Sequence, residues 1–254
     1  MLHKAKKEPE EPALSAPVVW LKAVYHFHVF HYRMPETVAI AAMTPFVPSP
    51  LTVKMAMVAA LLQRGEDWKA KQLAPYLPQM KVHIMPPKAA FSFKAFLRYR
   101  SVPAVESAGS LDETGSYYPS RPHIREYALL SEDLILFVEL PDTKLRPLVE
   151  EALRNIRYLG CKDSQVWCCS VQDATQVDLQ TEPIVTPLSE GKAGTVVLLA
   201  DFNSEAQGVT LENLIPGRRK KEHYQDPPPA CVLPGRVEAK GRTRVFLREV
   251  KAQR

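Results

Sequence analysis

The order of its strands and helices constrains the fold of this 254-residue chain more than any other feature. Helical patterns predict one helix between the first two strands and a second helix before the last strand. Runs of β-branched and aromatic residues predict the strands at 18–30, 81–85, 125–140 (one or two strands) and 165–171. The series β-α-β-β-α-β is typical of the ferredoxin-like fold, in which two helices cover one face of an antiparallel sheet. We therefore expect an α+β domain of this kind.

Both helices carry start and stop signals. Ser49 suits the N-cap of the first helix, and Pro50 suits its first position, where the missing N–H costs nothing. Gly65 suits the position just past its end. For the second helix, Thr143 is the expected cap and Gly160 the expected stop. The first helix is expected to bury a stripe of apolar residues at helical spacing, which Leu61 widens: Leu51, Met55, Val58 and Leu62.

The element order holds only if region 86–122, which we predict to be irregular, is an insertion between the second and third strands. Connections this long are usually functional or disordered. Its basic residues alternate with aromatic ones: Lys88, Phe91, Phe93, Lys94, Phe96, Arg98, Tyr99, Arg100, Tyr117, Tyr118 and Arg121. This pattern is typical of proteins that bind single-stranded nucleic acid, because the cations bind phosphates and the rings stack on bases. A solvated hairpin is an equally good interpretation, and the aromatic octapeptide of ordinary RNA-recognition modules is absent.

The chain divides into a tail at 1–17, a folded domain at 18–171 and a β-rich, basic extension at 172–254. Strands are expected in the extension at 195–199 and 244–250. Its last 39 residues hold eleven Lys/Arg against four Asp/Glu, although the whole chain carries only +5. The densest run, at 218–221, is by itself best interpreted as a solvated loop. The charge is thus concentrated in the extension and in the insertion.

Several classes of protein are excluded or disfavoured. Neither GxGxxG nor GxxxxGK[ST] occurs, and glycines number only 10 against 23 prolines, so a glycine-rich phosphate loop is not expected. The four cysteines form no CxxC pair, which disfavours a zinc ribbon and favours the reducing cytosol. No apolar run reaches the ~18 residues of a membrane helix. His26 and His28 share a strand face, but no further metal ligands are evident, so packed histidines are expected. We expect Trp20, Trp68 and Trp167 at core or edge positions.

Three stretches together carry a family resemblance: YRMPET at 32–37, PFVPSPL at 45–51 and YLGCKDS at 158–164. In order and spacing they resemble the CRISPR-associated protein five family. This family is the RAMP-superfamily subunit of type I Cascade that caps the 5′ handle of the guide RNA (crRNA). The resemblance covers about 20–171, and the long C-terminal part is most similar to the archaeal type I-A branch.

The resemblance implies a fold, partners and a set of RNA contacts. Region 88–121 would be an inserted β-hairpin, the thumb. The partners would be crRNA, the large subunit and the backbone subunit, with target DNA met only through the complex; no cofactor, metal or membrane is implied. By position, the expected RNA-binding residues are Arg33, Ser49, Lys54, Lys94, Arg98, Tyr99, Arg100, Arg121, Arg125, Lys162 and Ser164.

Two other functions remain open. One branch of the family cleaves CRISPR repeat RNA without metal, using Tyr, Lys and His, with Lys and His adjacent. No Lys-His pair follows the insertion here, so a non-catalytic subunit is the leading interpretation. Were the chain such an endoribonuclease, its candidates would be His28, His31, Tyr32 and His123. The second alternative is a protein-interaction module that makes no direct RNA contact.

Overall fold

The first layer of the fold is a four-stranded antiparallel sheet. The computed structural model describes residues 19–31, 41–100, 120–215, 217–241 and 243–248. The sheet order is β3 (Lys81–Met85), β6 (Leu134–Leu140), β1 (Val19–Phe27), β7 (Val166–Ala174). These are the four predicted strands, and β7 forms one edge. Strand β6 is buried on both faces, since Leu136, Phe137 and Val138 have no exposed surface.

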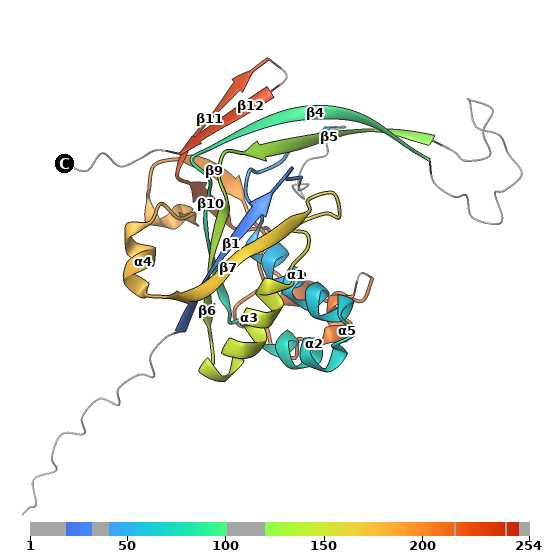
Figure 1. The fold of residues 1–254 in the computed structure, drawn as a ribbon, viewed down its shortest axis with the longest axis vertical. Helices are drawn as coiled ribbons and strands as arrows, with labels where there is room; N and C mark the ends of the chain where they lie inside the picture. Colours follow the sequence, from blue (N-terminus) through green and yellow to red (C-terminus); the bar gives the residue numbers. More distant parts are fainter. Residues whose placement is uncertain (1–18, 32–40, 101–119, 216, 242, 249–254) are drawn as a thin grey trace, which may run out of the picture.

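Two helices, α1 (Pro50–Gln63) and α3 (Arg146–Arg154), pack against the sheet, and α2 (Asp67–Leu73) packs beside them. Figure 1 shows the three helices grouped on one side of β1 and β7. The Tyr25 hydroxyl, fully buried in β1, donates to the carbonyl oxygen of Leu153 in α3 at 2.8 Å. Burial raises the pKa of Tyr25. Strand and helix are thereby tied together inside the core.

Helix α1 begins as predicted but buries a wider face than the predicted stripe. Ser49 is its N-cap and accepts a hydrogen bond from the Thr52 amide. Leu62, expected in the buried stripe, is 38 % exposed. Val58 and Leu61 are buried as expected, and Leu51 and Met55 are half-buried against the core. The complete set of buried residues is Val53, Lys54, Ala56, Met57, Val58, Ala60 and Leu61. Apolar residues surround most of this helix, so their spacing could not show which side meets the core.

The second helix is shorter than predicted and has a different cap. A 3₁₀ turn, Thr143–Leu145, precedes α3, and the Asp142 carboxylate, not Thr143, caps it by accepting from the Lys144 amide. The helix ends at Arg154, six residues before Gly160. Gly160 nevertheless has a φ of 96°, a left-handed conformation that glycine tolerates best. It therefore serves the turn that follows the helix, and not the helix end.

The inserted region is a long β-hairpin, so the prediction of irregular structure was wrong and that of a hairpin was right. Strand β4 (Ala89–Arg100) pairs with β5 (Ser120–Leu130) along eleven residue pairs. The insertion is wider than predicted because β5 continues to Leu130. The hairpin belongs to a second sheet, ordered β11 (Gly235–Lys240), β12 (Thr243–Arg248), β4, β5, β2 (Ala41–Ala42). Figure 1 shows the hairpin extending well beyond the rest of the fold.

The C-terminal part wraps around the first sheet. It contributes α4 (Gln176–Thr181), α5 (Leu211–Leu214) and a third sheet of β8 (Thr186–Pro187), β10 (Ala230–Leu233) and β9 (Thr195–Leu198). The strands expected near 195–199 and 244–250 are confirmed. Its buried Leu199, Phe202 and Phe246 join the same hydrophobic core as β1 and α1. Among the described residues, no helix is long and apolar enough to cross a membrane.

Candidate nucleic-acid interface

A glycine turn between α3 and β7 is the centre of the candidate interface. The Leu159 amide donates to the Ser164 carbonyl at 3.1 Å, and the Ser164 amide to the Cys161 carbonyl at 3.0 Å. The buried Ser164 hydroxyl donates to the carbonyl of His31 and accepts from its amide, both at 2.6 Å. The turn is thus fastened to the chain that leaves β1. Ser164 acts here as an internal clamp and has no exposed surface.

A groove of about 520 Å³ lies beside this turn. Two of its cations, Arg157 and Lys162, are exposed, and no ion pair joins either of them to another described residue. Two aromatic rings, Tyr158 and Trp167, share the groove with them. The complete lining is His28, Gln63, Arg157, Tyr158, Lys162, Gln165, Val166 and Trp167. Cations and rings are therefore combined in one open depression, as single-stranded nucleic acid requires.

Trp167 is the largest exposed ring of the groove, 48 % exposed on edge strand β7. His26 lies along it, with ring centroids 4.4 Å apart, and His28 meets it edge-on at 5.0 Å. Of the three tryptophans, Trp20 is in the core as expected, and Trp167 is at an edge as expected but with an open ring. Trp68 is 65 % exposed on α2, which contradicts the expectation.

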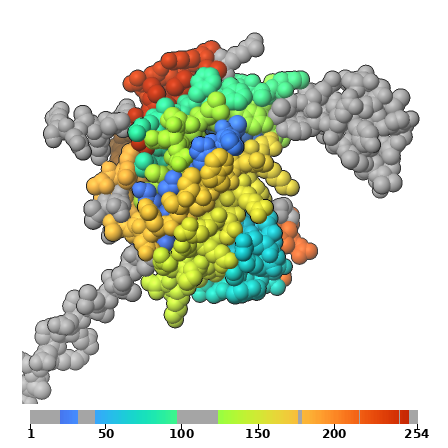
Figure 2. Space-filling view, in the orientation of Figure 1, coloured from blue at the N-terminus to red at the C-terminus, as the bar shows by residue number. Residues whose placement is uncertain are grey.

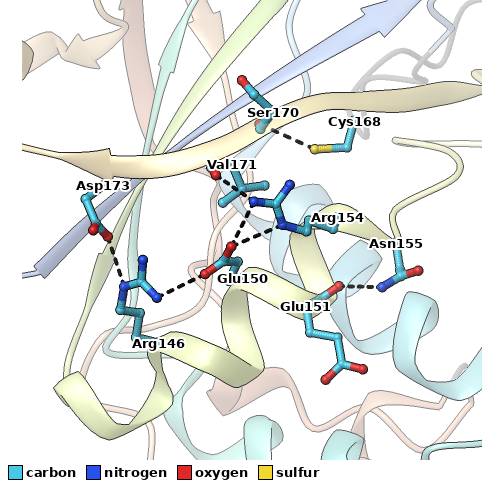
Figure 3. Close-up of polar contacts among 9 residues, drawn as sticks. All are labelled: Arg146, Glu150, Glu151, Arg154, Asn155, Cys168, Ser170, Val171 and Asp173. Atoms are coloured by element: carbon cyan, nitrogen blue, oxygen red, sulfur yellow. Dashed lines mark hydrogen bonds and ion pairs between the residues drawn. The ribbon is translucent and has the colours of Figure 1, made fainter.

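Strand β7 is held rigidly against α3. Arg154 donates to the carbonyl of Val171 and to Glu150, both at 2.8 Å, and Arg146 bridges Glu150 and Asp173 (Figure 3). The figure shows these side chains forming a continuous row between helix and strand. The strand that carries Trp167 therefore has a fixed position, which preorganises the groove.

The turn also joins the base of the hairpin. Arg125 forms an ion pair with Asp163, and the Tyr127 hydroxyl donates to the same carboxylate at 3.2 Å. Tyr127 stacks on Phe93 at 5.9 Å between centroids and contacts the ring of His31 at 5.0 Å. In Figure 2 the yellow residues of the turn and β7 adjoin the green hairpin on one face. The groove, the turn and the hairpin base thus form one surface.

The histidines have separate roles in this surface. His26 donates from Nδ1 to Asp133 at 2.7 Å and lies 5.9 Å from His28 between ring centroids, so the predicted shared face is confirmed. No group of metal-binding residues occurs among the described side chains. His31 points elsewhere: it is buried, and its Nδ1 donates to the Glu126 carbonyl at 2.7 Å. Burial lowers the pKa of His31.

A buried ion pair underlies the hairpin base, and the sequence patterns did not reveal it. Glu126, 1 % exposed, accepts from Arg244 of β12 at 2.6 and 2.9 Å, from the Thr44 amide and from the Ser92 hydroxyl. Burial disfavours its charged form, but these donors outweigh burial and hold the pKa of Glu126 below its ordinary value. The only sequence signal was an acidic residue among the apolar positions of β5.

The predicted RNA-binding residues fall into three groups. Lys162, Arg125 and Lys94 are on the surface just described or on the hairpin. Ser49, Ser164 and Lys54 are buried, and Lys54 donates to Asp201 at 2.6 Å, so the structure gives these three internal roles. The remaining residues lie outside the described part, wholly or in their side chains: Arg33, Arg98, Tyr99, Arg100 and Arg121. The same holds for Tyr32 and for the His123 side chain.

No protein-family profile matches this chain. A sequence match is found to "CRISPR-associated protein Cas5" of Archaeoglobus fulgidus, 24 % identical over 151 residues. It covers 58 % of this chain and 62 % of the relative, so about three fifths of the relative's length is matched. The match confirms the resemblance to the CRISPR-associated protein five family. A crystal structure of a CRISPR protein from the same organism aligns with 91 % of this chain and all of its own, at 13 % identity and a TM-score of 0.43.

Proposed function

We propose that this chain, a CRISPR-associated protein of the Cas5 type, is a non-catalytic RNA-binding subunit of a type I surveillance complex. It holds the 5′ handle of the crRNA and links the large and backbone subunits. Its scaffold is the ferredoxin-like fold with the β4–β5 hairpin as the thumb. The observation that carries the proposal is the groove beside the Gly160 turn, where exposed cations and rings meet at the hairpin base.

The groove suits an unpaired nucleotide in three respects. Trp167 offers a ring face to a base, and its support by His26 fixes the orientation of that ring. Arg157 and Lys162 offer charge-assisted hydrogen bonds to phosphate oxygens. The Arg125–Asp163 link then leads from the groove to the hairpin, so a strand of RNA can pass from one to the other.

We expect the purified protein to bind RNA that carries the repeat-derived 5′ handle more tightly than RNA with a scrambled handle. The logarithm of affinity should fall linearly with the logarithm of salt concentration, because phosphate contacts release counterions. Fluorescence anisotropy at several salt concentrations measures both quantities. Equal affinity for the two RNAs would contradict the proposal and would favour a protein-interaction module without a direct RNA role.

The two exposed tryptophans provide a matched test of the groove. Trp167→Ala is expected to weaken handle binding by about 5- to 150-fold, since base stacking contributes about 1–3 kcal/mol per base. Trp68→Ala removes an equally large exposed ring from α2, which is not part of the groove lining, and should leave the affinity unchanged. A similar loss in both variants would mean that Trp167 is not a stacking platform.

A metal-free endoribonuclease is the second candidate, because His28 lines the groove beside Lys162 and the His26–Asp133 pair adjoins it. The test is a denaturing gel of repeat RNA incubated with the protein and a chelator. The non-catalytic proposal predicts intact RNA. Cleavage at one position that disappears in His28→Ala would replace that proposal with the enzyme.

A further inference from the structure

A second basic surface lies in the C-terminal part, on the turn at 217–221. Its four cations, Arg218, Arg219, Lys220 and Lys221, are all exposed, and no ion pair joins any of them to another described residue. The arginines of β11 and β12 differ from these four, since they pair with carboxylates: Arg236 with Glu238, Arg244 with Glu126, and Arg248 with Glu132. Among the described residues of the extension, the cations without an ion pair are therefore concentrated on this turn.

The backbone of the turn at 217–221 is held by hydrogen bonds and by buried neighbours. It therefore differs from the solvated loop that the sequence predicts. Gly217 adopts a φ of 85°, and the Arg218 amide donates to the Ile215 carbonyl at 3.0 Å. On either side, Leu214 and His223 are buried. The His223 amide donates to the Lys220 carbonyl at 3.2 Å, which closes the turn. The four cations therefore project from an ordered backbone.

The turn is anchored to helix α1. Tyr224 stacks on Phe202 at 5.1 Å between ring centroids, and the Gln225 amide donates to the carbonyl of Asp201. The carboxylate of Asp201 in turn accepts from Lys54 of α1. Figure 2 shows the orange-red residues of this part of the chain beside the cyan helices. The position of the turn is thus set by the folded core.

Buried polar atoms next to the turn lack partners. The Nδ1 atom of His223 and the hydroxyl of Tyr224 are buried without a hydrogen bond to any described residue. Buried polar atoms without a partner are uncommon in folded proteins. One acidic residue, Glu222, separates His223 and Tyr224 from the four cations in the chain, so buried hydrogen-bonding atoms lie close to the positive charge.

The turn is separate from the groove. It is tied to α1 at Lys54, whereas the groove includes Gln63 at the other end of this helix. Nine residues of helix separate these two positions, about 14 Å at ~1.5 Å per residue. No described residue of the turn lines the groove, so an RNA nucleotide held in the groove leaves the turn free for another segment of nucleic acid.

From this arrangement we propose that the turn at 217–221 is a second nucleic-acid-binding surface, which takes the phosphodiester backbone without regard to sequence. Four adjacent cations on a fixed turn match a row of phosphates, and counterion release makes such contacts favourable. The backbone comes either from double-stranded DNA or from a segment of crRNA beyond the handle. Both sources offer the same chemistry.

The test replaces the four cations by glutamine in the full chain (R218Q, R219Q, K220Q, K221Q). Anisotropy against salt is measured with three probes: a random-sequence DNA duplex, a handle RNA alone, and the handle RNA extended at its 3′ end. A control variant with the same change in net charge carries glutamine at four exposed lysines elsewhere: Lys71, Lys81, Lys144 and Lys192.

If the proposal is right, the four-site variant loses salt dependence that the control keeps. Each lost contact reduces the slope by about 0.9 for duplex DNA or about 0.7 for single strands. A smaller salt slope with the DNA duplex would assign the surface to DNA. A smaller salt slope with the extended RNA, and not with the duplex, would assign it to crRNA. Unchanged slopes with both probes overturn the proposal, and loss of a protein subunit from the complex would then indicate an acidic protein partner.

The result is independent of the function proposed for the groove. Binding of the handle RNA alone should be the same in the four-site variant and in the wild type, so failure of one proposal does not imply failure of the other. The double variant R218Q/K220Q repeats the measurement with half the change. If the four-site variant unfolds at a lower temperature than the wild type, the salt slopes of this double variant test the proposal.

Discussion

Replacing Lys54 by alanine is expected to lower the free energy of unfolding by about 3 kcal/mol, because it leaves the Asp201 carboxylate without its partner. Lys54 is 1 % exposed, and its ammonium lies 2.6 Å from Asp201 and 5.6 Å from the centre of the Phe202 ring. The Asp201 side chain is 24 % exposed, so water relieves part of the penalty, and the low end of the usual range applies. Chemical denaturation of the two proteins measures the difference.

The pH dependence of the free energy of unfolding shows whether the loss of stability has an electrostatic cause. Burial raises the pKa of Asp201 and outweighs the opposing effect of Lys54, so loss of Lys54 raises it further. In Lys54→Met, which keeps the apolar stem, Asp201 takes up a proton as pH falls through that raised pKa. The deficit against wild type should therefore be largest near neutral pH and shrink in acid. A deficit that is constant with pH would contradict an electrostatic origin.

Two further variants complete the test. The pair variant Lys54→Met with Asp201→Asn leaves no unpaired charge and should recover most of the stability. Lys192→Ala removes one partner of an exposed ion pair with Glu190 and should cost less than about 1 kcal/mol. If instead Lys54→Met left stability unchanged but reduced the salt slope of RNA binding, Lys54 would contact phosphate as the family resemblance implied.

The burial of Lys54 could not be predicted from the sequence. A lysine in a helix is usually solvent-exposed, and the resemblance assigned it to RNA. Its burial depends on Asp201 and Phe202, which come from a segment about 150 residues later that covers the second face of α1. No local pattern predicts that contact. The same segment also meets the start of the helix, since the Leu51 amide donates to the Ala200 carbonyl at 3.0 Å.

Local signals predicted local structure well. Ser49, Pro50 and Gly65 mark the ends of α1 because caps depend on neighbouring residues alone. The four strands of the first sheet followed from β-branched and aromatic runs. Region 86–122 was harder: the backbone bonds of β4 are satisfied by β5 and by β12, and the latter pairing joins residues over 150 positions apart. Sequence periodicity carries no information about such a partner.

The candidate interface was predicted in part. Lys162 and the Gly160 turn were identified from the YLGCKDS stretch, and the structure shows the groove at that turn. Trp167 was assigned to a core or edge position because a lone tryptophan in a strand is usually packed. Its ring is open because β7 is an edge strand, which only the sheet order reveals. Arg157 and Gln63 had no sequence signal at all.

Replacing Glu126 by alanine should have the larger effect, a loss of about 4 kcal/mol in the free energy of unfolding. The change leaves Arg244 without its carboxylate and removes the acceptor of the Thr44 amide and of the Ser92 hydroxyl. Breaking a buried ion pair typically costs about 3–5 kcal/mol. For a domain of this size, about 4 kcal/mol corresponds to a fall in Tm of about 8–16 °C, which calorimetry detects readily.

Acid titration and handle binding show what this ion pair does for the hairpin. The Arg244, Ser92 and Thr44 donors hold the folded pKa of Glu126 below its ordinary value of 4.5. Its contribution is therefore complete above that pH and is lost as pH falls through the folded pKa. The deficit in the free energy of unfolding of Glu126→Gln against wild type should accordingly shrink in acid.

Because Glu126 joins β5 to β12 beneath Tyr127 and Arg125, the variant should also bind handle RNA more weakly. Arg236→Ala, which removes an exposed pair with Glu238, should change neither property. Unaltered stability and RNA affinity in Glu126→Ala would mean that the hairpin base is held in place by its strand pairing alone.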